Sequence, residues 1–159
     1  MTRKLFTARA SRLSCARPST IFALLDDAKT WPSWSVVQSV TFDAPGDELQ
    51  RRVGIRRTFN TGPFHVYEEV VQREPDRRID YILLKGMPMK DYRGRIDLVP
   101  EADGTRIEWT SSFRPKYPGT GWFWRMFMTK VLRDMARDVS KAAEGIDRSG
   151  ASVPLAVET

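Results

Sequence analysis

Histidine, the side chain most often used as a general base, occurs once in this chain, at His65. A serine–histidine–aspartate triad would therefore have to use it. If residues 60–63 form the turn between two strands, Phe59 lies opposite Phe64, and His65 lies on the face away from the apolar side chains. We expect a surface histidine, although a shift of the pairing by one residue would turn it inward.

The same pairing predicts an acidic and a basic side chain on the covered face. It places Arg57 opposite Val66 and Ile55 opposite Glu68, so that Arg57 and Glu68 are diagonal neighbours. They either form a buried ion pair that satisfies itself or anchor a ligand's carbonyl or phenol group at the floor of a pocket. With Tyr92, whose phenol could act as a weak general acid, they are the candidates for catalysis.

Large aromatic and methionine side chains are also expected to point inward, by strand alternation and helical period. They either fill a core or line a pocket for a small molecule. The residues predicted to bind a ligand are Trp34, Arg57, Glu68, Tyr81, Tyr92, Trp109, Trp124 and Met128.

Metal and cofactor sites find little support in the sequence. One histidine and one cysteine, Cys15, are too few for a metal site built on these residues. The segment Pro118-Gly119-Thr120-Gly121 lacks the lysine of a phosphate-binding loop. We therefore expect neither a metal nor a cofactor.

Length and charge limit the class of protein. A chain of 159 residues is expected to form one domain. Its net charge of +6 comes from arginines scattered over several segments, without a nucleic-acid-binding motif, so no nucleic-acid partner is expected. No apolar stretch approaches the roughly 20 residues of a membrane span, and the N-terminus lacks a signal core. We expect a cytoplasmic protein.

Hydrophobic periodicity predicts the elements that position these residues. A first strand covers residues 5–16, and two short helices follow before residue 35. Six further strands are predicted at residues 36–42, 50–59, 64–73, 78–84, 92–99 and 105–113. Their short connections indicate antiparallel neighbours.

A long helix is predicted over residues 120–146, with Thr120 as its N-cap. Its apolar stripe contains Trp124, Phe127, Met128, Val131, Leu132, Met135, Val139, Ala142 and Ile146. The predicted fold is α+β: a seven-stranded curved antiparallel sheet wrapped around this helix, with two short helices between strands 1 and 2. Residues 1–147 form the domain, and residues 148–159 are expected to be a flexible tail.

Several segments resemble the SRPBCC superfamily (START/Bet v 1-like), and within it the polyketide cyclase/dehydrase-like branch. They are ARPSTIFALLD at residues 16–26, WPSWS at 31–35, VGIRR at 53–57, EEVV at 68–71, EP at 74–75, YRG at 92–94 and DGTRIEW at 103–109. The resemblance spans about residues 6–143 and implies a helix-grip fold. Members of the superfamily include ligand carriers, cyclases, lipid-transfer modules and co-chaperones.

The function expected from these observations is binding of a small hydrophobic molecule, aromatic or polyketide-like, between the sheet and the helix. The alternatives are a polyketide cyclase or aromatase acting on a carbonyl-rich substrate, and a co-chaperone-like interaction module. Trp122, Phe123 and Met126 fall outside the buried stripe of the helix. They either provide a homodimer contact or pack under the preceding loop.

Overall fold

The computed structural model describes residues 3–43 and 53–150. The strands are β1 (Phe6–Ser14), β2 (Ser39–Phe42), β3 (Arg56–Thr61), β4 (Phe64–Glu74), β5 (Arg78–Lys85), β6 (Met89–Glu101) and β7 (Gly104–Pro115). The helices are α1 (Pro18–Asp26), the short 3-10 helix η1 (Ala28–Thr30), α2 (Trp31–Trp34) and α4 (Gly121–Ser149).

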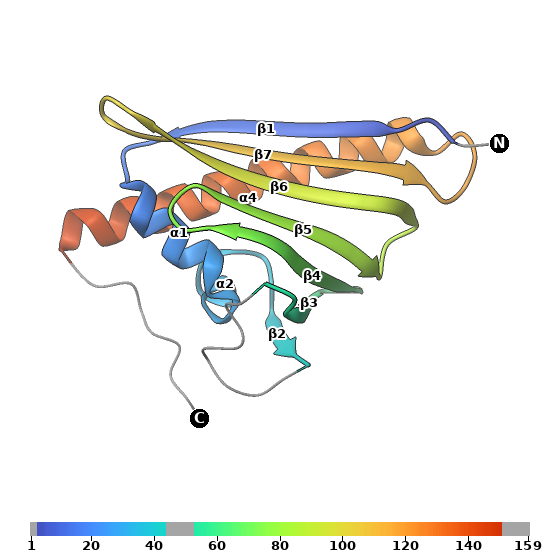
Figure 1. Ribbon diagram of the computed structural model, residues 1–159, viewed down its shortest axis with the longest axis horizontal. Coiled ribbons are helices and arrows are strands. Elements are labelled where there is room, and N and C mark those ends of the chain that lie inside the picture. The colour runs from blue at the N-terminus through green and yellow to red at the C-terminus, as the bar shows by residue number, and fades with distance from the viewer. Residues whose placement is uncertain (1–2, 44–52, 151–159) are drawn as a thin grey trace.

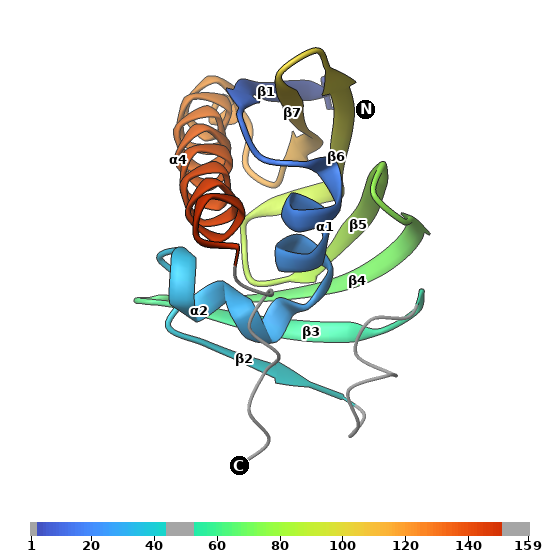
Figure 2. The ribbon, with the colours of Figure 1, turned by 90° about the vertical axis from the view of Figure 1, so that its left-hand side faces the viewer.

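All seven strands belong to one antiparallel sheet in the order β1-β7-β6-β5-β4-β3-β2. Figure 1 shows α4 running behind the long strands β1, β7 and β6. Viewed from its end in Figure 2, the sheet curves from β1 around to β2, with α4 on its inner side and α1 and α2 beside the helix. The predicted fold class is confirmed.

Alternation along the strands explains how the sheet covers the helix. Every second residue of β7 from Thr105 to Phe113 is buried, including Ile107, Trp109 and Phe113, and the residues that alternate with them are half-buried. The buried face of α4 contains Met128, Leu132, Met135 and Val139, four members of the predicted apolar stripe. No helix in the described ranges combines the length and apolar character that crossing a membrane needs.

Several predicted boundaries differ from the structure by one to six residues, and two of the differences have a local cause. The strand predicted at residues 50–59 begins at Arg56, because residues 53–54 form a turn in which Gly54 has a φ of 92°; residues 50–52 lie outside the described residues. The helix continues to Ser149 and ends at Gly150, whose left-handed conformation (φ 67°) terminates it. Thus the first two residues of the predicted tail are helical, and residues 151–159 are not described.

The predicted register of the β3–β4 hairpin is wrong by two residues. Thr61, not Phe59, lies opposite Phe64, because a two-residue turn replaces the expected four-residue one. Gly62 provides the positive φ (59°) that such a tight turn requires. A shift of two residues keeps every side chain on its predicted face, but it brings Arg57 directly opposite Glu68.

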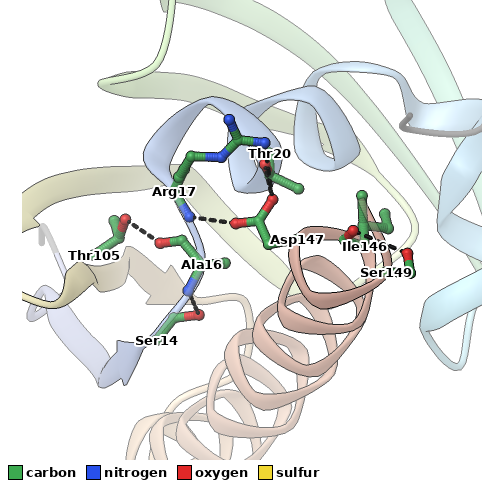
Figure 3. A network of polar contacts seen from close by, with 8 residues as sticks. All are labelled: Ser14, Ala16, Arg17, Thr20, Thr105, Ile146, Asp147 and Ser149. Atoms are coloured by element: carbon green, nitrogen blue, oxygen red, sulfur yellow. Dashed lines mark hydrogen bonds and ion pairs between the residues drawn. The ribbon is translucent and has the colours of Figure 1, made fainter. Parts of the chain in front are cut away.

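Polar contacts hold the C-terminal end of α4 against the start of α1 (Figure 3). The Asp147 carboxylate accepts hydrogen bonds from the Arg17 backbone N–H at 2.7 Å and from the Thr20 hydroxyl at 2.6 Å. Nearby, the Thr105 hydroxyl donates to the Ala16 carbonyl at 2.8 Å. Asp147 therefore satisfies a backbone donor at the beginning of α1, which has no capping side chain of its own.

Candidate functional site

A cavity of about 360 Å³ lies between the concave face of the sheet and the first half of α4. This volume is at the lower end of the range of about 300–1,000 Å³ typical of small-molecule sites. The wall consists of Trp31, Val36, Val37, Phe59, Thr61, Pro63, Phe64, Val66, Glu68, Tyr81, Leu83, Met87, Tyr92, Trp109, Phe127, Met128, Val131, Leu132 and Met135.

Polar groups are few in this wall, and some are already paired. The indole N–H of Trp31 donates to the Leu25 carbonyl at 3.2 Å, and that of Trp109 donates to the Tyr81 hydroxyl at 2.8 Å. The Tyr81 hydroxyl, which accepts this bond, also interacts with the hydroxyl of Tyr92. Glu68 and the two tyrosines, Tyr81 and Tyr92, are therefore the main polar features facing an otherwise apolar space.

The Arg57–Glu68 pair lies at the edge of this wall. Arg57 Nη2 is 3.7 Å from Glu68 Oε1, and the side chains are 2% and 13% exposed. The Arg57 guanidinium also lies 4.9 Å from the ring centre of Phe59 and 5.4 Å from that of Trp31, within reach of cation–π attraction. Its buried Nε has no hydrogen-bond partner among the described residues.

The ionic contact is longer than a hydrogen bond, so neither charge is fully compensated. Burial raises the pKa of Glu68 to about 7, against the opposing effect of the Arg57 cation. Burial also raises the pKa of Tyr92 and Tyr81, so that both phenols stay protonated at neutral pH. The site thus combines two neutral phenols, which also interact with each other, with a carboxyl group that changes charge near pH 7.

This pKa predicts how stability depends on pH. The folded pKa of Glu68 lies above the ordinary value of 4.5, so the folded state binds the proton more tightly than the unfolded state. We expect the free energy of unfolding to fall as pH rises from about 4.5 to about 7, between the unfolded and folded pKa values of Glu68, and Glu68→Gln to flatten this slope. Urea denaturation at several pH values measures it. His65→Gln, on the exposed face of the same strand, is the control and should keep the slope.

Gly94 has no side chain, and the Tyr81 ring occupies the space that one would fill. The two residues pair directly across β5 and β6, and a Cβ on Gly94 would lie 2.0 Å from the tyrosine ring. The absence of a side chain at this position therefore allows the phenol to lie against β6 and reach Trp109.

We expect Gly94→Ala to push Tyr81 out of place and to destabilise the fold by about 1–3 kcal/mol, the usual effect of overpacking. Chemical denaturation measures the loss, and tryptophan fluorescence reports the altered Trp109–Tyr81 contact. Gly145→Ala is the matched control, since no atom lies within 4 Å of its added Cβ. A loss no larger than that of the control would contradict the proposed packing.

Five of the eight residues predicted to bind a ligand line the cavity: Glu68, Tyr81, Tyr92, Trp109 and Met128. Arg57 stands behind the wall, in contact with Glu68 and with the rings of Phe59 and Trp31.

Two predicted residues, Trp34 and Trp124, do not belong to the lining. Trp34 packs against Trp31 and donates its indole N–H to the Thr30 hydroxyl, because α2 turns it to the side. Trp124 lies one turn before the lining part of α4 and packs edge-on against Phe127.

His65 is exposed, as predicted, and its Nδ1 contacts the Asn60 side chain on the outer face. This position separates it from the cavity, so a histidine-based triad there is ruled out. Among the described residues, no group of three or more histidine, cysteine, aspartate or glutamate side chains could hold a metal ion.

Several lining residues were not predicted as site residues. Phe127 and Met135 belong to the predicted apolar stripe of the helix, so periodicity placed them inward without separating lining from core. Phe59 and Val66 follow from strand parity in the same way. Trp31 begins the four-residue helix α2, and Met87 lies in the connection between β5 and β6. The position of both short segments depends on tertiary packing.

Comparison with known families and structures gives a consistent result. The profile of the family described as "Polyketide cyclase / dehydrase and lipid transport" matches residues 6–144. No curated protein sequence matches the chain significantly.

Solved structures with a similar fold come from plants and bacteria. A point mutant of norcoclaurine synthase from Thalictrum flavum, in complex with a transition-state analogue, superposes with a TM-score of 0.74 at 13% identity, covering 92% of this chain and 99% of that one. A START superfamily protein from Mycobacterium smegmatis gives 0.72 at 15% identity, covering 89% and 98%. A protein from Nitrosospira multiformis gives 0.71 at 19% identity, covering 90% and 99%. At these identities the likeness concerns the fold.

Proposed function

The chain belongs to the polyketide cyclase/dehydrase and lipid transport family of the SRPBCC superfamily, and we propose that it binds a small hydrophobic molecule in the cavity between the sheet and α4. The observation that carries this proposal is an apolar cavity of about 360 Å³ whose polar groups are confined to a few side chains. In such a site, burial of the ligand's apolar surface stabilises the complex, and a few directed hydrogen bonds orient the ligand.

The polar groups of the wall favour a particular ligand chemistry. Tyr81 and Tyr92 are neutral donors, so they suit a carbonyl or phenol oxygen on the ligand. Glu68, supported from behind by Arg57, can accept from a ligand hydroxyl when ionised and donate to a carbonyl when protonated. An aromatic or polyketide-like molecule with one or two oxygen atoms fits this arrangement.

Native mass spectrometry of freshly purified protein would detect a retained ligand, and thermal shift with a panel of hydroxylated aromatic compounds would test binding directly. We expect stabilisation by at least one class of compound. Val131→Phe adds a ring to the α4 side of the cavity and should abolish the shift. Val53→Phe is the matched control, because this exposed valine does not line the cavity. Binding unaffected by Val131→Phe would contradict the proposed site.

A second function, cyclase- or aromatase-type catalysis on a carbonyl-rich chain, is favoured by Glu68 alone. A carboxyl group with a pKa near 7 in a water-poor site can act as a general acid or base at neutral pH. An enzyme predicts that Glu68→Gln, Tyr92→Phe and Arg57→Ala lose turnover of a polyketide-like substrate while binding survives. A carrier predicts binding without turnover in the wild-type protein.

A further inference from the structure

Four large apolar side chains are exposed together around the start of α4. Tyr117 is 55% exposed, Trp122 60%, Phe123 49% and Met126 64%. We call these four residues the aromatic patch. Two of them pack edge-on against each other: the ring centres of Trp122 and Phe123 are 6.3 Å apart. Exposed aromatic side chains that contact one another in this way mark an interaction surface.

The segment that carries this patch is basic, and one of its cations, Arg114, pairs with Asp91 at 3.4 Å. Residues 114–133 contain five basic residues and no acidic one. At 100° per residue, Lys130 and Arg133 lie on the same exposed face of α4 as Trp122 and Met126. The first acidic side chain of the helix is Asp134, which pairs with Lys130 at 2.6 Å in a solvent-exposed contact.

We propose that the aromatic patch docks this protein on an anionic membrane surface. Tryptophan, tyrosine and phenylalanine are favoured at the boundary between headgroups and acyl chains. Lysine and arginine near such a surface each add attraction to anionic lipids. The patch therefore has the two components of interfacial binding, an apolar face that inserts and a basic rim that attracts.

A second copy of the chain is a poorer occupant. A two-fold contact places the same patch of both subunits face to face. Such a contact would bring together two copies of a segment, residues 114–133, that has five basic residues and no acidic one, so like charges would gather around the interface. An anionic lipid surface presents the opposite charge, so charge complementarity favours the membrane over the homodimer.

The patch also adjoins the cavity. Phe123 stacks on Phe127 with ring centres 6.5 Å apart, and Phe127 lines the cavity wall. The exposed Val36 and Pro63 also line the cavity, so part of its rim is at the surface. Docking through the patch would hold Phe127 and the helix side of this rim close to the bilayer, from which an apolar ligand could enter. Entry of a ligand from the bilayer rests on the proposed function, whereas the docking itself does not.

Co-sedimentation with vesicles tests the docking. We expect binding to vesicles of phosphatidylcholine with about one third phosphatidylserine and little binding to pure phosphatidylcholine. The variant Trp122→Ala/Phe123→Ala should weaken binding by about tenfold or more. Leu13→Ala is its control, because it removes an exposed apolar side chain from β1, far from the patch, and should bind like wild type. Unchanged melting temperatures would show that the variants fold.

The basic rim is tested by charge reversal at two places on the same helix. Lys130→Glu/Arg133→Glu lies within about two turns of Met126 and should weaken binding about tenfold or more. Lys141→Glu/Arg148→Glu makes the same change in net charge, but more than 20 Å from Met126 along α4 at about 1.5 Å per residue. This distance exceeds the Debye length of about 8 Å. The distant pair should have a much smaller effect.

Three outcomes would overturn the proposal: no binding of the wild-type protein to the anionic vesicles, binding that Trp122→Ala/Phe123→Ala leaves unchanged, or equal effects of the two charge-reversed pairs. Sedimentation velocity without vesicles adds a fourth. A stable dimer that Trp122→Ala/Phe123→Ala dissociates would assign the patch to a second copy of the chain. Ligand binding in the cavity is measured separately, so its failure leaves the vesicle result unaffected.

Discussion

Arg57→Ala is expected to destabilise the protein by about 3–5 kcal/mol at about pH 8, where the Glu68 carboxyl is ionised in the wild-type protein and would lose its counter-charge. The 2% exposure of the Arg57 side chain means that water cannot replace the lost partner. The substitution also removes a cation that lies close to the stacked rings of Phe59 and Trp31. Urea denaturation followed by circular dichroism measures the change.

The neighbouring residue provides a matched control. Arg56 pairs with Glu69 on the outer face at 2.9 Å, on the same two strands, but its side chain is exposed. Arg56→Ala should therefore have a much smaller effect. The double variant Arg57→Met/Glu68→Leu should recover most of the stability lost in Arg57→Ala, since it replaces both buried charges with apolar groups. Equal losses for Arg57→Ala and Arg56→Ala would show that the buried pair does not contribute in this way.

Trp109→Ala is expected to cost about 3–5 kcal/mol, the usual loss for a fully buried aromatic side chain. In a domain of this size such a loss lowers the melting temperature by roughly 6–20 °C. Trp109 is 2% exposed, contacts Trp31 edge-on at 6.2 Å and donates its indole N–H to the Tyr81 hydroxyl. The substitution also enlarges the cavity, so binding should shift towards larger apolar compounds.

Two further variants separate the contributions of this residue. Trp109→Phe keeps a ring but removes the N–H donor to Tyr81, and should cost less than Trp109→Ala. Trp122→Ala removes the same type of side chain from an exposed position and should leave the melting temperature nearly unchanged. A similar melting temperature for Trp109→Ala and Trp122→Ala would contradict the central position of Trp109.

The fold could be predicted because its signals are local. The alternation along β6 and β7 and the helical period of α4 each describe one element in isolation, and the structure confirms which side chains they turn inward. The short turns between successive strands leave antiparallel pairing as the natural solution. Helix, strand and inward face therefore follow from the order of residues.

The register of β3 and β4 shows where local signals become insufficient. Residues 60–63 are compatible with a turn of two residues or of four, and either turn keeps Arg57 and Glu68 on the covered face. Only the paired strands determine that Gly62 and Pro63 form the turn and that the two charges meet directly.

The candidate site depends on relations between elements. Strand alternation placed Glu68, Tyr81, Tyr92 and Trp109 inward, helical period placed Met128 inward, and all five line the cavity. Parity could not exclude Trp34 and Trp124, because a side chain that points inward either fills a core or faces a space. For the same reason, helical period turned Phe127 inward but could not show that it lines the cavity.

By itself, then, the sequence determined the elements, their inward faces and the family of folds, since each follows from periodicity and short-range turn chemistry. Tertiary structure alone decided that a hollow of about 360 Å³ remains beneath α4 and that Trp31 and Met87 help to close it. A cavity is a small difference between the volume that the backbone encloses and the volume that the side chains fill. That difference exists only once helix, sheet and connecting segments are placed together.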